Sequence, residues 1–182
     1  AETVVREELS RTEWAIANPG LMWGPGDVIN SAKLITRMAA NKVPAFSPGG
    51  TNIVDVRDVA RGLVSFLSPL PLGERYILGG ENLPFREVNR VVSEVLGVPG
   101  PQKCLPRWMK PILYRGTLAY ELLCRTPPPL TADNVESAYL FRYFDSGKAE
   151  RVIDWKPRIP FRETIEDAVS WLEREGMLQR AT

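Results

Sequence analysis

The apolar residues of this chain follow two spacings, which predict an alternation of short strands and amphipathic helices. Consecutive apolar residues, as in a buried strand, predict strands at 14–17, 52–54 and 75–78. Apolar residues three and four positions apart predict helices at 29–40, 84–96, 131–140, 146–153 and 161–175, and Gly97 is expected to end the second of these. Residues 1–9 have helical propensity but no capping residue before them, so we interpret them as the end of a helix.

A further helix is predicted directly after the strand at 52–54. Asp55 or Asp58 can cap its first turn, because a carboxylate accepts hydrogen bonds from the free backbone N–H groups there. We favour capping over a catalytic carboxylate pair for Asp58, and interpret Asp145 as the cap of the helix at 146–153. The helix after Asp58 has four apolar residues that are expected to face inward, namely Val59, Leu63, Val64 and Leu67.

The segment 106–124 predicts a helix that is apolar around much of its circumference. Three interpretations are open: a buried helix, a lid over an apolar ligand, or a helix that contacts a membrane surface. We favour the buried helix and give membrane contact the smallest weight. Three consecutive prolines at 127–129 end the segment.

An unusual density of turn residues follows the first strand. The strand at 14–17 is expected to be covered on both faces, and Asn18-Pro19-Gly20 ends it because proline has no backbone donor. Leu21-Met22-Trp23 are then expected on an irregular loop that stops at a second turn, 24–27. Ligands bind at the carboxyl ends of strands in open α/β sheets, so this loop is a predicted ligand site, with a covered surface loop as the alternative.

The composition of the chain excludes several classes of function but says little about the fold. The chain has 182 residues, 44% of them hydrophobic, and a formal net charge of +1, so no charged field indicates a nucleic-acid partner. We find no stretch long enough to span a membrane and no signal peptide, which leads us to expect a cytoplasmic protein. The chain has no histidine, and Cys104 and Cys124 lack metal-ligand spacing, so no metal site is expected and both thiols are predicted to be buried.

Four motifs in order along the chain resemble the carboxyl-terminal half of an extended short-chain dehydrogenase/reductase. The likeness is to the NAD-dependent epimerase/dehydratase group, including dihydroflavonol-reductase-like and 3β-hydroxysteroid-dehydrogenase-like members. Each motif alone is weak, but the four together are a strong signal, and the resemblance extends over nearly the whole chain. The four motifs are Ala1-Glu2, NPGLMWGPGD at 18–27, VDVRDVA at 54–60, and DSGKA at 145–149 with WKP at 155–157.

The resemblance implies an α/β fold, in which residues 1–182 form the last Rossmann-type elements and a mostly helical substrate lobe with a few short strands. It also implies that NAD or NADP is the cofactor, and that the proton-transferring Tyr-x-x-x-Lys pair and the glycine-rich phosphate loop are missing from this chain, so that no catalytic residue lies in it. The implied cofactor contacts are Asn18, Pro19, Gly20 and Leu21. The implied substrate contacts are Met22, Trp23 and Lys33, although a solvated helix face is the simpler interpretation of Lys33.

The expected function is therefore the substrate-binding part of an NAD(P)-dependent oxidoreductase or epimerase that is inactive without its amino-terminal half. The alternatives are a nucleotide-sugar epimerase or dehydratase and a non-catalytic binding module. Nucleotide-sugar enzymes of the family bind the substrate diphosphate with arginines. In this chain the two matching positions hold Thr51 and Val135, which favours another substrate. Arg57 or Arg142 could take the place of the missing arginines. We expect a small-molecule substrate, no nucleic-acid or metal partner, little membrane contact, and an open possibility of self-association.

Overall fold

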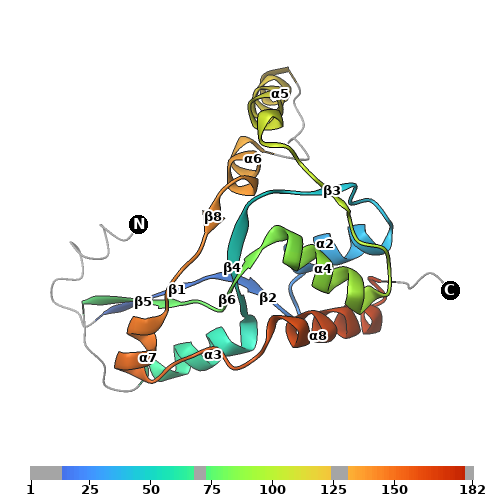
Figure 1. The fold of residues 1–182 in the computed structure, drawn as a ribbon. Coiled ribbons are helices and arrows are strands. Elements are labelled where there is room, and N and C mark those ends of the chain that lie inside the picture. Colours follow the sequence, from blue (N-terminus) through green and yellow to red (C-terminus); the bar gives the residue numbers. More distant parts are fainter. Residues whose placement is uncertain (1–13, 68–72, 124–130, 179–182) are drawn as a thin grey trace.

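The computed structural model describes residues 14–67, 73–123 and 131–178, and Figure 1 shows their arrangement. The helix expected at 1–9 and the thiol of Cys124 lie outside these residues. Among the residues described, no helix has both the length and the apolar character that crossing a membrane requires.

Three small groups of strands form the β structure. In the first, β1 (Ala15–Pro19) pairs in parallel with β5 (Glu74–Leu78). In the second, β4 (Gly50–Asp55) pairs in parallel with β2 (Leu21–Trp23) and β8 (Phe141–Arg142), and antiparallel with β6 (Glu81–Pro84). The third is the parallel pair of β3 (Ala45–Phe46) and β7 (Lys103–Cys104).

The helices predicted within the described residues all occur, with shifts of a few residues at their ends. The α2, α4 and α8 helices lie beside one another at one end of the molecule, and α3 and α7 lie near the β1–β5 pair (Figure 1). Gly97 ends α4 in the left-handed conformation, as its sequence position predicts. The helices are α2 (Ser31–Ala39), α3 (Val56–Ser65), α4 (Phe85–Leu96), α5 (Lys110–Leu123), α6 (Ala132–Ala138), α7 (Gly147–Ile153) and α8 (Phe161–Arg174), with a 3-10 turn η1 (Arg107–Met109) before α5.

Two hydrophobic clusters hold these elements together. The larger one fills the space between α2, α4 and α8 and includes Ile35, Val92 and Ile165, which are fully buried. The smaller one joins β4 and β5 to α7 and contains Tyr76 and the indole of Trp155. Since residues from both ends of the chain meet in each cluster, the fold depends on long-range contacts.

Several sequence-based expectations are wrong in detail. Residues 21–23 form strand β2 instead of an irregular loop, because β4 supplies a hydrogen-bonding partner that the sequence does not reveal. The strand at 15–19 is not buried on both faces, since its residues are half-buried or exposed and only β5 pairs with it among the described strands. Three residues of the α3 region that were expected to face inward are instead exposed, namely Leu63, Val64 and Leu67.

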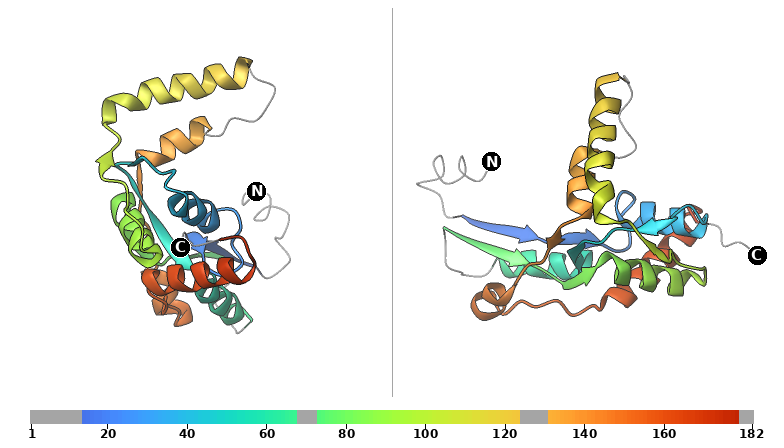
Figure 2. Two further views of the ribbon diagram at one scale, coloured as in Figure 1. Left: turned by 90° about the vertical axis from the view of Figure 1, so that its right-hand side faces the viewer. Right: turned by 45° about the horizontal axis from the view of Figure 1, so that its top comes forward.

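The apolar helix predicted at 106–124 is present but is not buried. It forms η1 and α5, which project with α6 from the rest of the molecule (Figure 2). Trp108, Leu122 and Leu123 are all strongly exposed. The thiol of Cys104, expected to be buried, is also exposed, because strand β7 lies at the base of this projection.

The unequal burial of the strands predicts unequal protection from hydrogen exchange. We expect fast amide exchange at residues 14–18, because the residues of β1 are half-buried or exposed. We expect slow exchange at 75–78 and 161–172, which contribute the buried residues Tyr76, Leu78 and Ile165. Exchange monitored by mass spectrometry on the 182-residue chain measures both. Full protection of 14–18 would contradict this expectation.

Candidate functional site

The predicted cofactor segment, residues 18–21, lies where the chain passes from one sheet to the other. Strand β1 ends at Pro19 beside β5, and β2 begins at Leu21 beside β4. Gly20 joins them, and its N–H donates to the carbonyl oxygen of Leu78 at 3.1 Å. The segment is therefore held by hydrogen bonds on both sides of the junction.

The buried side-chain amide of Asn52 lies directly behind Gly20. The Asn52 side chain donates to the Gly80 carbonyl at 3.1 Å and to Asn82 Oδ1 at 2.7 Å, and its own Oδ1 accepts from the Gly80 N–H at 2.9 Å. A Cβ atom added to Gly20 would lie 2.3 Å from Asn52 Oδ1. Only glycine fits at position 20 without movement of this amide, so steric demand explains one residue of the Asn-Pro-Gly turn.

A pocket of about 420 Å³ opens beside this junction, in front of β2 and the loop that follows it. Met22 is 40% exposed, whereas Trp23 is only 5% exposed and packs its ring against Phe161 at 5.6 Å between centroids. Met22 therefore offers more surface to a ligand than Trp23 does. The pocket is lined by Gly20, Leu21, Met22, Trp23, Pro25, Gly26, Asp27, Asn30 and Val56.

Sequence reasoning missed part of this lining. Pro25, Gly26 and Asp27 belong to the second turn and could have been included from their nearness to Trp23 in the chain. Val56 could not, because only the parallel pairing of Trp23 with Asp55 brings it to the pocket. The structure therefore adds to the pocket lining one residue, Val56, that lies far in sequence from the segment 18–27.

The only acidic residue in this lining is already occupied by hydrogen bonds. The Asp27 carboxylate accepts from the backbone N–H groups of Ile29, Asn30 and Ser31 at 2.6–3.0 Å, and from the Ser31 hydroxyl at 2.8 Å. Burial on its own would raise the pKa of Asp27, but these hydrogen bonds outweigh it and hold the pKa below its ordinary value. Asp27 therefore orders the loop before α2 and is poorly suited to act as a general base.

The structure separates Lys33 from Met22 and Trp23. Lys33 lines a neighbouring pocket of about 450 Å³ on the other side of Asn30, which borders both pockets. Arg37 lies one turn further along α2 and lines the same second pocket. The predicted substrate residues are thus divided between two adjoining pockets, the first mainly apolar and the second containing two cations.

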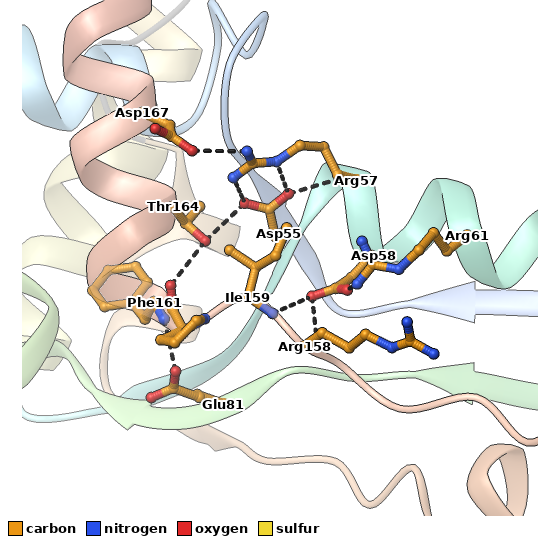
Figure 3. Close-up of polar contacts among 11 residues, drawn as sticks. Asp55, Arg57, Asp58, Arg61, Glu81, Arg158, Ile159, Phe161, Thr164 and Asp167 are labelled. Atoms are coloured by element: carbon orange, nitrogen blue, oxygen red, sulfur yellow. Dashed lines mark hydrogen bonds and ion pairs between the residues drawn. The ribbon is translucent and has the colours of Figure 1, made fainter.

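A polar network at the end of β4 joins that strand to α8 (Figure 3). The buried carboxylate of Asp55 accepts from the Arg57 guanidinium at 2.8 and 2.9 Å, from the Arg57 N–H at 2.8 Å, and from the Thr164 hydroxyl at 2.8 Å. Burial would raise the pKa of Asp55, but the bonds from Arg57 and Thr164 lower it below its ordinary value. Asp55 is therefore the side-chain cap of α3, one of the two residues expected in that role.

Asp58 has a different structural role from the expected cap. Its buried carboxylate accepts from the N–H groups of Arg158 and Ile159, each at 3.0 Å, and pairs with Arg61 (Figure 3). It thereby fastens the segment before α8 to α3, which the chain separation of about a hundred residues hides from sequence reasoning. Asp145 likewise lies one residue before the cap, Ser146, and accepts from the Gly147 N–H at 2.9 Å.

The two arginines considered for diphosphate binding lie in different surroundings. Arg57 is held by Asp55 and by Asp167, whose carboxylate is 2.7 Å from its guanidinium. Arg142 is on β8, in register with Thr51 of β4, and is exposed. Among the described residues there is no group of three His, Cys, Asp or Glu side chains able to hold a metal ion.

Comparison with known proteins gives relatives of about twice this length. No family model matches the chain. A candidate dihydroflavonol 4-reductase from Synechocystis sp. is 30% identical over 172 residues, which are 90% of this chain and 49% of that protein. Sterol demethylase protein B from Methylococcus capsulatus is 27% identical over 179 residues, covering 96% of this chain and 54% of that protein. The chain thus spans about half the length of these relatives.

Solved structures with the same fold agree with these relatives. A nucleoside-diphosphate-sugar epimerase from Pseudomonas aeruginosa matches with a TM-score of 0.79 at 23% identity, over 98% of this chain and 54% of that one. An enzyme from Bordetella bronchiseptica, crystallised with NAD and UDP, matches with a TM-score of 0.65 at 18% identity, over 93% of this chain and 47% of that one. In sequence and in fold, the chain matches the carboxyl-terminal half of an extended short-chain dehydrogenase/reductase.

Proposed function

We propose that this chain is the substrate-binding portion of an NAD(P)-dependent oxidoreductase or epimerase that acts on a carbonyl or hydroxyl group. The observation that carries the proposal is the pocket at the junction of β1 and β2, which is lined by the predicted residues Gly20, Leu21, Met22 and Trp23. Its place at the carboxyl end of a parallel strand is where α/β folds bind ligands. The relatives named for reductase and sterol chemistry support this class of reaction.

The residues at this junction fit the nicotinamide end of a dinucleotide, which would supply the hydride when bound. Gly20 has no side chain to obstruct a planar ring, and its N–H donates to the Leu78 carbonyl oxygen. The sequence contains no Gly-x-x-Gly-x-x-Gly loop, so the diphosphate would be held by a part of the protein amino-terminal to Ala1. That part would also provide the proton-transferring Tyr and Lys, and the chain alone would be inactive.

The lining of the first pocket favours an apolar substrate. Its walls include Met22, Trp23 and Val56, and its only carboxylate, Asp27, is engaged by four donors. A charged sugar phosphate would find no free cation in this lining, whereas a flat carbonyl compound would bury apolar area there. We therefore place dihydroflavonol-like and sterol-like compounds before nucleotide sugars.

One observation supports the nucleotide sugar as a second candidate. Arg142 lies beside Thr51, where the family's nucleotide-sugar enzymes are expected to have an arginine, and no ion pair engages it within the described residues. Arg57 is less suited because two carboxylates hold it. Two results together would favour this candidate. The parent protein would convert nucleotide sugars but not apolar carbonyl compounds, and Arg142→Gln would lose the activity on nucleotide sugars.

Met22→Ala provides the sharper test of the first candidate. In the full-length protein we expect kcat/KM for an apolar carbonyl substrate to fall about tenfold, because a side chain that contacts the substrate is removed. Cofactor affinity and the melting temperature should stay close to those of the parent, since Met22 is 40% exposed. Coenzyme absorbance measures the rates, and fluorescence titration measures cofactor binding.

Met177→Ala and Trp23→Phe complete this test. Met177 is also exposed but does not line the pocket, so its replacement should leave kcat/KM unchanged. Trp23→Phe keeps a ring against Phe161 and should change substrate kinetics more than cofactor affinity. Equal loss of cofactor and substrate binding, or a lowered melting temperature without a kinetic effect, would place these residues outside the substrate site.

A further inference from the structure

The lining of the first pocket offers few polar groups to a ligand. Its side chains with nitrogen or oxygen atoms are those of Trp23, Asp27 and Asn30. The indole nitrogen of Trp23 is buried, and the carboxylate of Asp27 already accepts four hydrogen bonds. Asn30 is exposed, and its side-chain amide forms no hydrogen bond within the described residues. Asn30 is therefore the residue of this lining whose side chain is left to bond a ligand.

The amide of Asn30 is free because Asp27 does the work that an asparagine at this position usually does. Asn30 stands at the N-cap of α2, where an asparagine side chain commonly accepts a hydrogen bond from the first turn of the helix. Here the Asp27 carboxylate accepts from the N–H of Ser31 at 2.6 Å and from the N–H of Asn30 itself at 2.9 Å. The same carboxylate thus holds the backbone of Asn30 in place and leaves its side chain unused.

Asn30 also has a distinctive place between the two adjoining pockets. It lines both of them, whereas Gly20 lines only the first, and Lys33 and Arg37 line only the second. A compound whose reacting group lies at the Gly20 junction therefore meets Asn30 on the side toward the second pocket. Because an amide both donates and accepts hydrogen bonds, it suits a neutral hydroxyl or carbonyl oxygen, whereas an anionic group would be bound better by the two cations.

We propose that Asn30 is a specificity-determining residue of the first pocket, whose amide hydrogen-bonds a hydroxyl or carbonyl oxygen of the substrate remote from the group that reacts. The inference rests on the function proposed for this pocket and narrows its substrate to apolar carbonyl compounds that carry a second oxygen. In a mainly apolar site a few polar groups fix the orientation of the ligand. An analogue without that oxygen would displace water from the amide and return no hydrogen bond to it.

Two steroid ketones test this assignment in the full-length protein. The probes are dihydrotestosterone and the same steroid without its hydroxyl group, which lies at the opposite end of the molecule from the carbonyl. We expect the parent protein to prefer the hydroxylated steroid about tenfold or more in kcat/KM. Asn30→Leu should remove most of this preference, by lowering kcat/KM for the hydroxylated steroid about tenfold and leaving the other steroid unchanged. Equilibrium dialysis of both steroids measures binding without turnover.

Three further variants serve as controls. Asn30→Gln keeps the amide and should retain part of the preference. Gln102→Leu replaces an exposed amide outside both pockets and should change nothing. Asp27→Ala should reduce the preference because it releases Asn30, and Asp27→Ala/Asn30→Leu should lose no more of it than Asn30→Leu alone, since both changes act on one hydrogen bond. Melting temperatures show which variants keep the fold.

The possible results separate this inference from the function on which it rests. Equal losses on both steroids in Asn30→Leu, or an unchanged preference, would overturn the role of Asn30 and leave the proposed function standing. A larger loss of preference in Lys33→Gln than in Asn30→Leu would assign the hydroxyl group to the second pocket instead. Failure of the parent protein to bind or convert either steroid would overturn the apolar substrate class itself, and the inference with it.

Discussion

Replacing Asp55 with alanine is expected to lower the free energy of unfolding by about 3 kcal/mol. The change leaves the Thr164 hydroxyl and the Arg57 guanidinium without the buried carboxylate to which both donate. It also removes the side-chain cap of α3. Denaturation by urea, followed by circular dichroism, measures the loss.

Asp167→Ala is the matched control for that experiment. Asp167 bonds to the same guanidinium at 2.7 Å, but both of these side chains are about 40% exposed. Because solvent screens such a pair, we expect its removal to cost less than about 1 kcal/mol. A cost for Asp167→Ala equal to that of Asp55→Ala would show that Asp55 does not dominate the network.

The same carboxylate predicts how stability depends on pH. Hydrogen bonds from Arg57 and Thr164 hold the folded pKa of Asp55 below its ordinary value of 3.8 despite its burial. Its contribution to stability is therefore fully present above about pH 5 and is lost as the pH falls through the folded pKa. The isosteric variant Asp55→Asn should start less stable and lose less stability between about pH 5 and pH 2. An identical acid slope in both proteins would contradict this assignment.

Gly20→Ala is expected to destabilise the chain by about 3 kcal/mol, although it adds a single methyl group. That methyl group would lie 2.3 Å from Asn52 Oδ1, and the amide cannot move without breaking its bond from the Gly80 N–H. The displaced turn should also reduce binding of cofactor in the full-length protein, because Gly20 lines the pocket. Thermal melts and fluorescence titration measure the two effects.

Gly116→Ala is the control for Gly20→Ala, because it replaces a glycine at a position where the added methyl group meets no neighbouring atom. Gly116 lies inside α5, and no atom lies within 4 Å of a Cβ added there. Its replacement should therefore stabilise the protein by about 0.5–1 kcal/mol, since alanine has the higher helix propensity. Loss of stability in both variants would mean that contact with Asn52 is not the cause at Gly20.

The sequence alone predicted the elements whose signals are local. Helices such as α4 and α8 carry their periodicity and their end signals within a dozen residues, so their positions followed from Gly97 and from the spacing of apolar residues. The family resemblance also followed from local motifs, and the relatives agree with it. The roles of residues 18–23 stay predictions, although the structure gathers 20–23 around one pocket.

Tertiary structure decided what depends on residues far apart in the chain. Strand β2 exists because β4 pairs with it, and Val56 reaches the pocket through that pairing. Asp58 fastens Arg158 and Ile159 instead of capping its own helix. Apolar composition likewise predicted a buried helix at 106–124, which the structure shows exposed. Composition indicates only that exposing these side chains to water costs free energy, and does not indicate which surface covers them. Whether a residue is buried depends on the neighbours that folding brings around it, and the spacing of apolar residues along the chain does not identify those neighbours.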